Sequence, residues 1–153
     1  MKIEKLSKSI FKQCENSTSK KLLLNICDYL NYGLTDSNDF YKNLYVDPVH
    51  DYYKNNHNLG DVFYSTPLSY HIIANMVCVQ LPKTTYNIIP FKMKWFKRCC
   101  NSVLEYINNN EIKEIHTPIF GTKILEGKWI DILSVMKETF SKSDHLNKLC
   151  IYE

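Results

Sequence analysis

A strand-to-helix connection in the last third of the sequence places the strongest constraint on the fold. Residues 115–129 run from an apolar stretch, through Pro118 and a loop containing Gly121, into an amphipathic segment that opens at Trp129. A strand that ends in such a loop exposes backbone N–H groups and the positive end of a helix dipole, an arrangement that suits an anionic ligand such as a phosphate. The loop is not a P-loop, because the Gly-Lys-Ser/Thr ending is absent. An ordinary strand-to-helix connection is the alternative, since Gly and Pro punctuate many loops.

Strand and helix patterns alternate through the second half of the chain. Short apolar runs predict strands at residues 22–27, 62–64, 72–79, 112–120 and 148–152, with Ser65-Thr66-Pro67 joining the second and third. Helical spacing of apolar residues predicts two long helices, whose faces carry Phe91, Trp95, Cys99, Val103 and Ile107, and Trp129, Leu133, Met136 and Phe140. A shorter helix carrying Phe40, Tyr41 and Leu44 is expected after a cap at Asp36, Ser37 or Asn38.

This alternation predicts an α/β fold of three layers, α/β/α, with a mixed central sheet and right-handed crossovers. In such folds ligands bind at the carboxyl ends of the strands. Two candidate loops, residues 28–35 and 121–129, leave strands at that edge. The sequence therefore predicts a ligand site between these two loops.

Length and composition indicate one soluble domain spanning residues 1–153, with 44% hydrophobic and 23% charged residues. A net charge of +3 is too mild to require nucleic acid or a membrane as a partner, and it suits a small anionic ligand. The lysines near the start, including Lys2 and Lys5, are interpreted as a solvated face. No apolar run approaches the roughly 20 residues that span a bilayer, and no signal peptide is recognisable. We expect a cytoplasmic protein.

Six cysteines are present, without a Cys-x-x-Cys pair and without a Cys–His set at zinc spacing. We therefore expect no metal site and no structural disulfide framework. In a reducing compartment most of these cysteines serve as small core hydrophobes. No other cofactor is expected.

The pattern Pro-x-x-Gly followed by Trp, from Pro118 to Trp129, resembles the second phosphate-binding loop of macro domains, which bind ADP-ribose and its derivatives. The usual family form is Pro-x-Ile-Gly-x-Gly, and Lys123 stands in place of the second Gly. Further segments resemble the phage-type group of the family: residues 22–33 its strand and first ligand loop, residues 59–63 and 73–80 its central strand pair, and residues 90–95 the start of the next helix. The resemblance covers the chain from about residue 20 onward.

The resemblance implies a diphosphate held between the two loops. In the second loop, backbone N–H groups would come from residues 121–124, a hydroxyl from Thr122 and a positive charge from Lys123. The ligand-binding set of this loop is Pro118, Gly121, Thr122, Lys123, Ile124 and Leu125. From the first loop the set is Asp28, Asn31, Tyr32, Gly33 and Leu34. Asn31 or Asp28 would lie near the distal ribose. Tyr32 would pack against that ribose or, alternatively, close over the core.

The adenine end departs from the family pattern. Macro domains usually carry Gly-Asp-Ile or Gly-Asp-Leu after the first strand, where the Asp accepts a hydrogen bond from the adenine amino group. Ser9 and Ile10, preceded by Lys8, occupy the matching place here. Tyr152, at the end of the last predicted strand, is a candidate for stacking on the base, with edge packing as the alternative. The glycines that usually follow in the first loop are also absent, which indicates a reshaped pocket or a different ligand.

Catalytic residues are not identified by the sequence. In the hydrolytic subgroup that uses a Lys–Asp pair, the Asp stands where this chain has Leu125, and Lys42 falls only in the region of that subgroup's Lys. Asp28 and Asp36 are the best candidates for a general base. His116, alone in a strand, is interpreted as a hydrogen-bonded structural residue.

Three functions therefore stay open. The first is a module that binds an ADP-ribose-like nucleotide signal and sequesters it, as phage anti-defence proteins do, in the host cytoplasm if the chain is viral. The second is an enzyme, an ADP-ribosyl hydrolase or an ADP-ribose-1″-phosphate phosphatase. The third is an interaction protein on a macro scaffold that binds no nucleotide. The oligomeric state cannot be inferred from these patterns.

Overall fold

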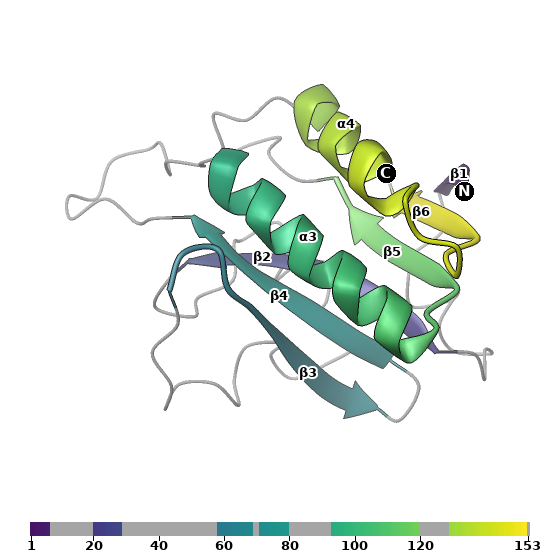
Figure 1. The fold of residues 1–153 in the computed structure, drawn as a ribbon, viewed down its shortest axis with the longest axis horizontal. Helices are drawn as coiled ribbons and strands as arrows, with labels where there is room; N and C mark the ends of the chain where they lie inside the picture. The colour runs from purple at the N-terminus through teal and green to yellow at the C-terminus, as the bar shows by residue number, and fades with distance from the viewer. Residues whose placement is uncertain (7–19, 29–57, 69–70, 80–92, 120–128, 153) are drawn as a thin grey trace.

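The computed structural model describes residues 1–6, 20–28, 58–68, 71–79, 93–119 and 129–152 (Figure 1). The short helix expected around residues 40–44 lies outside these described residues. The elements are β1 (Lys2–Leu6), β2 (Lys21–Asp28), β3 (Val62–Leu68), β4 (His71–Val79), α3 (Met93–Asn110), β5 (Glu114–Pro118), α4 (Trp129–Phe140) and β6 (Lys148–Tyr152).

The six strands form one mixed sheet in the order β1-β6-β5-β2-β4-β3. Every neighbouring pair is parallel except β3 and β4, which are antiparallel. The parallel pairs run as β1 with β6, β6 with β5, β5 with β2 and β2 with β4. Their carboxyl ends therefore meet at one edge of the sheet, as predicted, and this edge carries the loops that follow β2 and β5.

Strand β2 shows that both faces of the sheet are covered. Successive side chains of a strand point to opposite faces, yet every residue from Leu22 to Cys27 is fully buried. A continuous apolar run of this kind is typical of parallel strands packed between two layers. The mixed sheet of the predicted three-layer α/β fold is thus confirmed.

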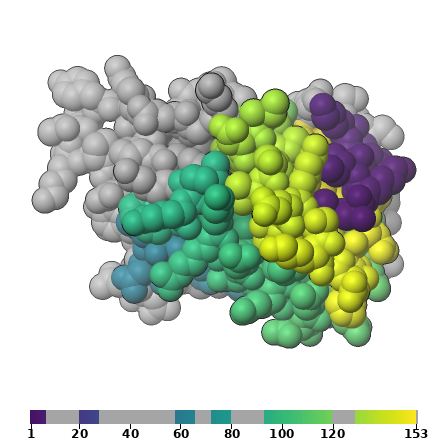
Figure 2. All heavy atoms as spheres, turned by 45° about the horizontal axis from the view of Figure 1, so that its top comes forward, coloured from purple at the N-terminus to yellow at the C-terminus, as the bar shows by residue number. Residues whose placement is uncertain are grey.

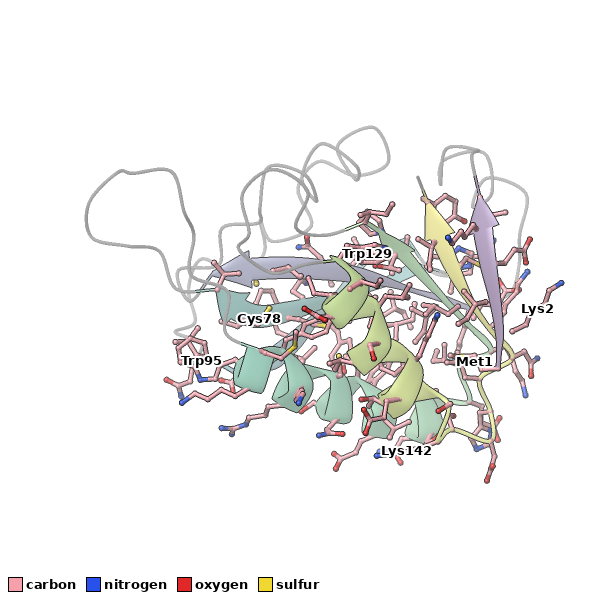
Figure 3. All side chains as sticks on the ribbon, turned by 90° about the horizontal axis from the view of Figure 1, so that it is seen from above. Met1, Lys2, Cys78, Trp95, Trp129 and Lys142 are labelled. Atoms are coloured by element: carbon pink, nitrogen blue, oxygen red, sulfur yellow. The ribbon has the colours of Figure 1, made fainter. Side chains whose placement is uncertain are left out.

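Helices α3 and α4 pack on the same face of the sheet (Figures 1 and 3). The buried side of α3 is formed by Phe96, Cys99, Cys100, Val103 and Ile107, and that of α4 by Ile132, Val135, Met136, Thr139 and Phe140. Five positions of the expected stripes are buried as predicted: Cys99, Val103, Ile107, Met136 and Phe140. Trp95, Trp129 and Leu133 are only partly buried and pack against the core, and Phe91 lies outside the described residues.

Helix α3 ends in a left-handed residue. Glu111 has a φ of 52°, and the N–H of Ile112 bonds back to the carbonyl oxygen of Ile107 at 3.1 Å. This six-to-one bond is that of a Schellman cap, which satisfies a carbonyl group left over at the helix end. The cap turns the chain toward β5, which runs from Glu114 to Pro118 and is shorter than the predicted strand 112–120.

Strand β3 is longer than the sequence predicted. Ser65-Thr66-Pro67 was expected to join two strands, but these residues lie within β3, which continues to Leu68. The pairing with β4 shifts register between Ser65 and Leu68. Proline is tolerated at such a place because β3 is the edge strand of the sheet and an irregular ladder does not need its missing N–H.

The five cysteines within the described residues, Cys27, Cys78, Cys99, Cys100 and Cys150, are free and buried. Their predicted role as core hydrophobes is confirmed for four of them. Cys78, Cys99 and Cys100 belong to the large core cluster, and Cys27 packs with Phe63 and Val77 on the face opposite the helices. Across the described ranges, no helix is long and apolar enough to cross a membrane.

Candidate functional site

The order in which the chain adds strands to the sheet reverses at β2 and β5. After β2 the chain adds β4 and β3 on one side of β2, and it then crosses through α3 to add β5 and β6 on the other side of β2. A reversal of this kind is the position at which open α/β sheets bind ligands, outside the carboxyl ends of the strands.

The two strands also part at this position. Their pairing covers Lys21 with Glu114, Leu22 with Ile115 and Leu23 with His116, and it stops there. Both strands nevertheless continue, β2 to Asp28 and β5 to Pro118. The carboxyl ends of β2 and β5 are therefore no longer paired where each strand leads into its predicted ligand loop.

Three predicted site residues fall within the described strands. Asp28 is the last residue of β2, Pro118 the last of β5 and Tyr152 the last of β6, and Pro118 and Tyr152 are direct register partners. All three thus lie at the carboxyl edge. The other predicted residues lie outside the described part of the chain: Ser9, Ile10, Asn31, Tyr32, Gly33, Leu34, Asp36, Lys42, Gly121, Thr122, Lys123, Ile124 and Leu125.

Tyr152 is held by a buried histidine. Its side chain is only 4% exposed, and its hydroxyl lies 2.6 Å from Nδ1 of His116, which is 2% exposed. On its other side, Nε2 of His116 lies 3.1 Å from Oε2 of Glu114. The ring of Tyr152 is tilted by 31° to the imidazole, with centroids 5.7 Å apart. The expectation that His116 is a hydrogen-bonded structural residue is confirmed.

Charges around Glu114 determine the proton positions in this chain of contacts. Burial acts to raise the pKa of Glu114, but the hydrogen bond from His116 and the charge of Lys148, 3.3 Å away, outweigh it and lower that pKa. Burial lowers the pKa of His116 to about 4, against the opposing effect of Glu114. The imidazole is therefore neutral near pH 7. Because an ionised carboxylate only accepts, Nε2 of His116 donates to Glu114 and Nδ1 accepts from Tyr152.

A second buried polar group joins β2, β4 and β3. Nδ2 of Asn25 donates to Oδ1 of Asn75 at 2.8 Å, and Nδ2 of Asn75 donates to Oγ of Ser65 at 2.7 Å and to the carbonyl oxygen of Phe63 at 3.3 Å. Both amides are fully buried. Oδ1 of Asn25 accepts no hydrogen bond within the described residues. This group fixes the register of three strands on the face away from α3.

Glu114, Asn25 and Asn75 form these buried contacts but were not predicted from the sequence. A signal for the asparagines was present, because each interrupts an otherwise apolar strand and a buried amide needs a partner. A signal for Glu114 was also present, since it stands two positions before His116 and so shares its face. Among the described residues, no cluster of His, Cys, Asp or Glu has the geometry to hold a metal ion.

Comparison with known proteins finds similar structures but no similar sequence. No protein-family model matches the chain, and no curated protein sequence matches it. Solved structures do match, at low identity. A macrodomain protein from Streptomyces coelicolor has a TM-score of 0.76 and 14% identity, covering 99% of each chain.

Two further structures make the same point. The macrodomain of Mycobacterium tuberculosis DarG has a TM-score of 0.75 and 14% identity, covering 99% of this chain and 98% of its own. A point mutant of an Oceanobacillus iheyensis macrodomain with ADPR has a TM-score of 0.59 and 13% identity, covering 99% of this chain and 85% of its own. The strand order, the direction of each strand pair and these likenesses agree, and the chain has the macrodomain fold.

Proposed function

We propose that this protein binds ADP-ribose or a nucleotide derived from it at the carboxyl edge of the sheet, between the segments that follow β2 and β5. The observation that carries the proposal is the divergence of these two strands after Leu23 and His116, at the point where the order of strands in the sheet reverses. Ligands of open α/β sheets bind at such a point. The Oceanobacillus iheyensis macrodomain of similar fold was solved with ADPR.

The proposed ligand contacts come mainly from backbone N–H groups. Residues Gly33 and Leu34 on one side and Gly121 to Ile124 on the other would hold the diphosphate, with Lys123 adding a positive charge. Successive backbone N–H groups bind phosphate oxygens without help from particular side chains. This explains how a chain that lacks several family glycines and the adenine-binding Asp can still retain a diphosphate.

We further propose that the protein retains the bound nucleotide unchanged and so sequesters it in the cytoplasm. Leu125 occupies the position of the acid in the Lys–Asp hydrolytic subgroup, so retention is favoured over turnover. A nucleotide signal captured in this way would be withdrawn from its receptor, which is the anti-defence role that the resemblance to phage-type macro domains suggests.

Isothermal titration calorimetry with ADP-ribose, ADP-ribose-1″-phosphate and AMP tests the proposal. We expect saturable binding of at least one ADP-ribose compound and loss of that binding in Gly121→Glu, because the new carboxylate would repel the diphosphate. Ile130→Glu is the matched control: Ile130 is the second residue of α4, is 73% exposed and should accept the same charge with little change in affinity.

Three results would count against the proposal. Equal affinity in Gly121→Glu and in the unmodified protein would place the site elsewhere. Equal loss in both variants would mean that added negative charge, and not the loop, is responsible. No binding of any ADP-ribose compound to the folded protein would favour an interaction module on a macrodomain scaffold.

A further inference from the structure

A hollow of about 450 Å³ lies between the edge strand β3 and helix α3. One end is formed by the turn at Gly60 and Asp61, one wall by Val62 and Tyr64 of β3, and the other wall by α3. Strand β4 separates β3 from β2, so this hollow is distinct from the proposed nucleotide site between β2 and β5.

The wall of the hollow on α3 is a row of polar side chains. Arg98, Ser102, Glu105 and Asn109 follow the spacing i, i+4, i+7 and i+11, which places them along one side of the helix. Arg98 and Glu105 carry opposite charges, and neither forms an ion pair or side-chain hydrogen bond to another described residue. Both are exposed. The row therefore presents a cation and an anion that are open to an external partner.

The position of Arg98 depends on a glycine. Gly60 has a φ of 95°, and a Cβ atom at that position would lie 2.7 Å from Cδ of Arg98. The aliphatic part of Arg98 thus lies directly against the turn. Nε of Arg98 lies 3.3 Å from the same position, so the guanidinium group begins at the Gly60 end of the hollow.

Glu105 lines the same hollow as two tyrosines, Tyr64 and Tyr106. The rings of Tyr64 and Tyr106 are stacked, with centroids 3.9 Å apart and an interplanar angle of 16°. Burial is the main cause that raises the pKa of Tyr64, and the neighbouring Tyr106 and Glu105 raise it further. The negative charge of Glu105 therefore acts on the aromatic part of the hollow. Aromatic rings beside a carboxylate are a favourable environment for an ammonium or guanidinium group.

The spacing of the two charges suggests the kind of partner. Seven residues of α-helix separate Arg98 from Glu105, a rise of about 10 Å. An extended peptide covers the same distance in about three residues. The row from Arg98 to Asn109 is about 16 Å long, which is longer than a single charged side chain or small zwitterion needs.

We propose that this hollow binds an extended peptide segment that carries an acidic and a basic residue about three positions apart. The carboxylate of the peptide pairs with Arg98. Its basic side chain pairs with Glu105 beside the ring of Tyr106. Ser102, between the two charges, is placed to bond with the peptide backbone. Exposed ion pairs contribute little individually, so this interaction is weak and sensitive to ionic strength.

Titration followed by ¹⁵N–¹H NMR tests the proposal at low salt. The first probe is a seven-residue Ser/Gly peptide with one Glu and one Lys three positions apart, and the second replaces its Lys with Glu. We expect saturable shifts at Arg98, Glu105 and Tyr106 with the first probe and about tenfold weaker binding of the second, roughly the effect of turning one attraction into a repulsion.

A charge reversal makes the test specific. In Glu105→Lys the preference should invert, so that the doubly acidic probe binds more tightly than the mixed one. Glu138→Lys, the same change at an exposed position on α4, should keep the original preference. Absence of shifts at millimolar peptide, or a preference that Glu105→Lys leaves unchanged, would overturn the proposal. Because ADP-ribose is not used, the result does not depend on the nucleotide site.

Discussion

Nδ1 of His116 and the hydroxyl of Tyr152 lie 2.6 Å apart, and this contact joins the middle of β5 to the last residue of β6. Glu114 extends it toward the amino edge of the sheet, where Lys148 bridges Glu114 and Glu4 at 3.3 and 3.6 Å. A line of polar contacts therefore crosses the sheet on the face away from α3. It ends at the edge where the nucleotide site is proposed.

The buried histidine should make stability depend on pH. His116 has a pKa of about 4 in the folded protein, below the ordinary value of about 6.5 for an unfolded chain. Between these values only the unfolded state binds the extra proton, so stability rises as pH increases from 4 to 6.5 and then levels off. The gain is about 3 kcal/mol over this window, at roughly 1.4 kcal/mol per pKa unit.

Urea unfolding at intervals between pH 4.5 and 7.5 measures this dependence. His116→Gln should flatten the slope relative to the unmodified protein, whereas His145→Gln, at a partly exposed position, should preserve it. Glu114 contributes in a different window, because its lowered pKa affects stability only as pH falls below the ordinary value of 4.5. An unchanged slope in His116→Gln would show that the imidazole is not kept neutral.

The amide pair on β2 and β4 should behave as one unit. Asn75→Leu removes the acceptor for Asn25 and the donor for Ser65, which leaves two buried groups without these bonds. The cost should be about 3 kcal/mol. Asn25→Leu should cost less, because Asn75 keeps its bonds to Ser65 and Phe63.

A double-mutant cycle measured by chemical denaturation checks the coupling. Asn25→Leu with Asn75→Leu should destabilise the protein by clearly less than the sum of the single changes, since both partners of the central bond are then apolar. Additive single and double effects would mean that the two amides stabilise the sheet independently.

The described cysteines should be chemically silent in the native protein. Burial raises the pKa of Cys99 to about 12 and that of Cys150 to about 11, and it raises those of Cys78 and Cys100 as well. The thiolate is the reactive form. With Cys14→Ser, a thiol-specific disulfide reagent at pH 8 should titrate none of the remaining five thiols within minutes and all five after unfolding. A rapidly reacting thiol would contradict the packing around that cysteine.

Much of the sheet could be predicted because its strands are dense in apolar residues. The run from Leu22 to Cys27 predicted β2 to within a residue at each end, and β6 was predicted with its observed bounds. Strand β3 was predicted too short because Pro67 is a strong turn signal in sequence. Only the position of β3 at the edge of the sheet makes that proline acceptable, and the order of strands is not a local property.

The place of the proposed site in the sheet could be predicted, but the contacts beneath it could not. The loops after Asp28 and Pro118 were expected to leave the carboxyl ends of strands and Tyr152 to end the last strand, and all three residues lie at that edge. The contact between His116 and Tyr152 could not be identified, because the two residues are 36 positions apart and are not register partners: His116 pairs with Cys150 and Tyr152 with Pro118. The bond between Asn25 and Asn75 spans 50 residues. Contacts of this range depend on register, which only the folded sheet defines.

A nucleotide bound at the proposed site should stay chemically intact. Turnover of ADP-ribose conjugates needs a base, or a water held beside the anomeric carbon. The resemblance to macro domains, on which the proposed function rests, puts Leu125 where one hydrolytic subgroup has its acid. Backbone N–H donors can retain a diphosphate without that acid. We therefore expect the ligand to be recovered intact when the complex is incubated for hours, denatured by heat and analysed by chromatography. Asp28 and Asp36 are the candidates for a general base that the sequence offers. Recovery of mainly hydrolysed product, at a rate lost in Asp28→Ala or Asp36→Ala and retained in the exposed control Asp131→Ala on α4, would establish the protein as an enzyme and exclude simple sequestration.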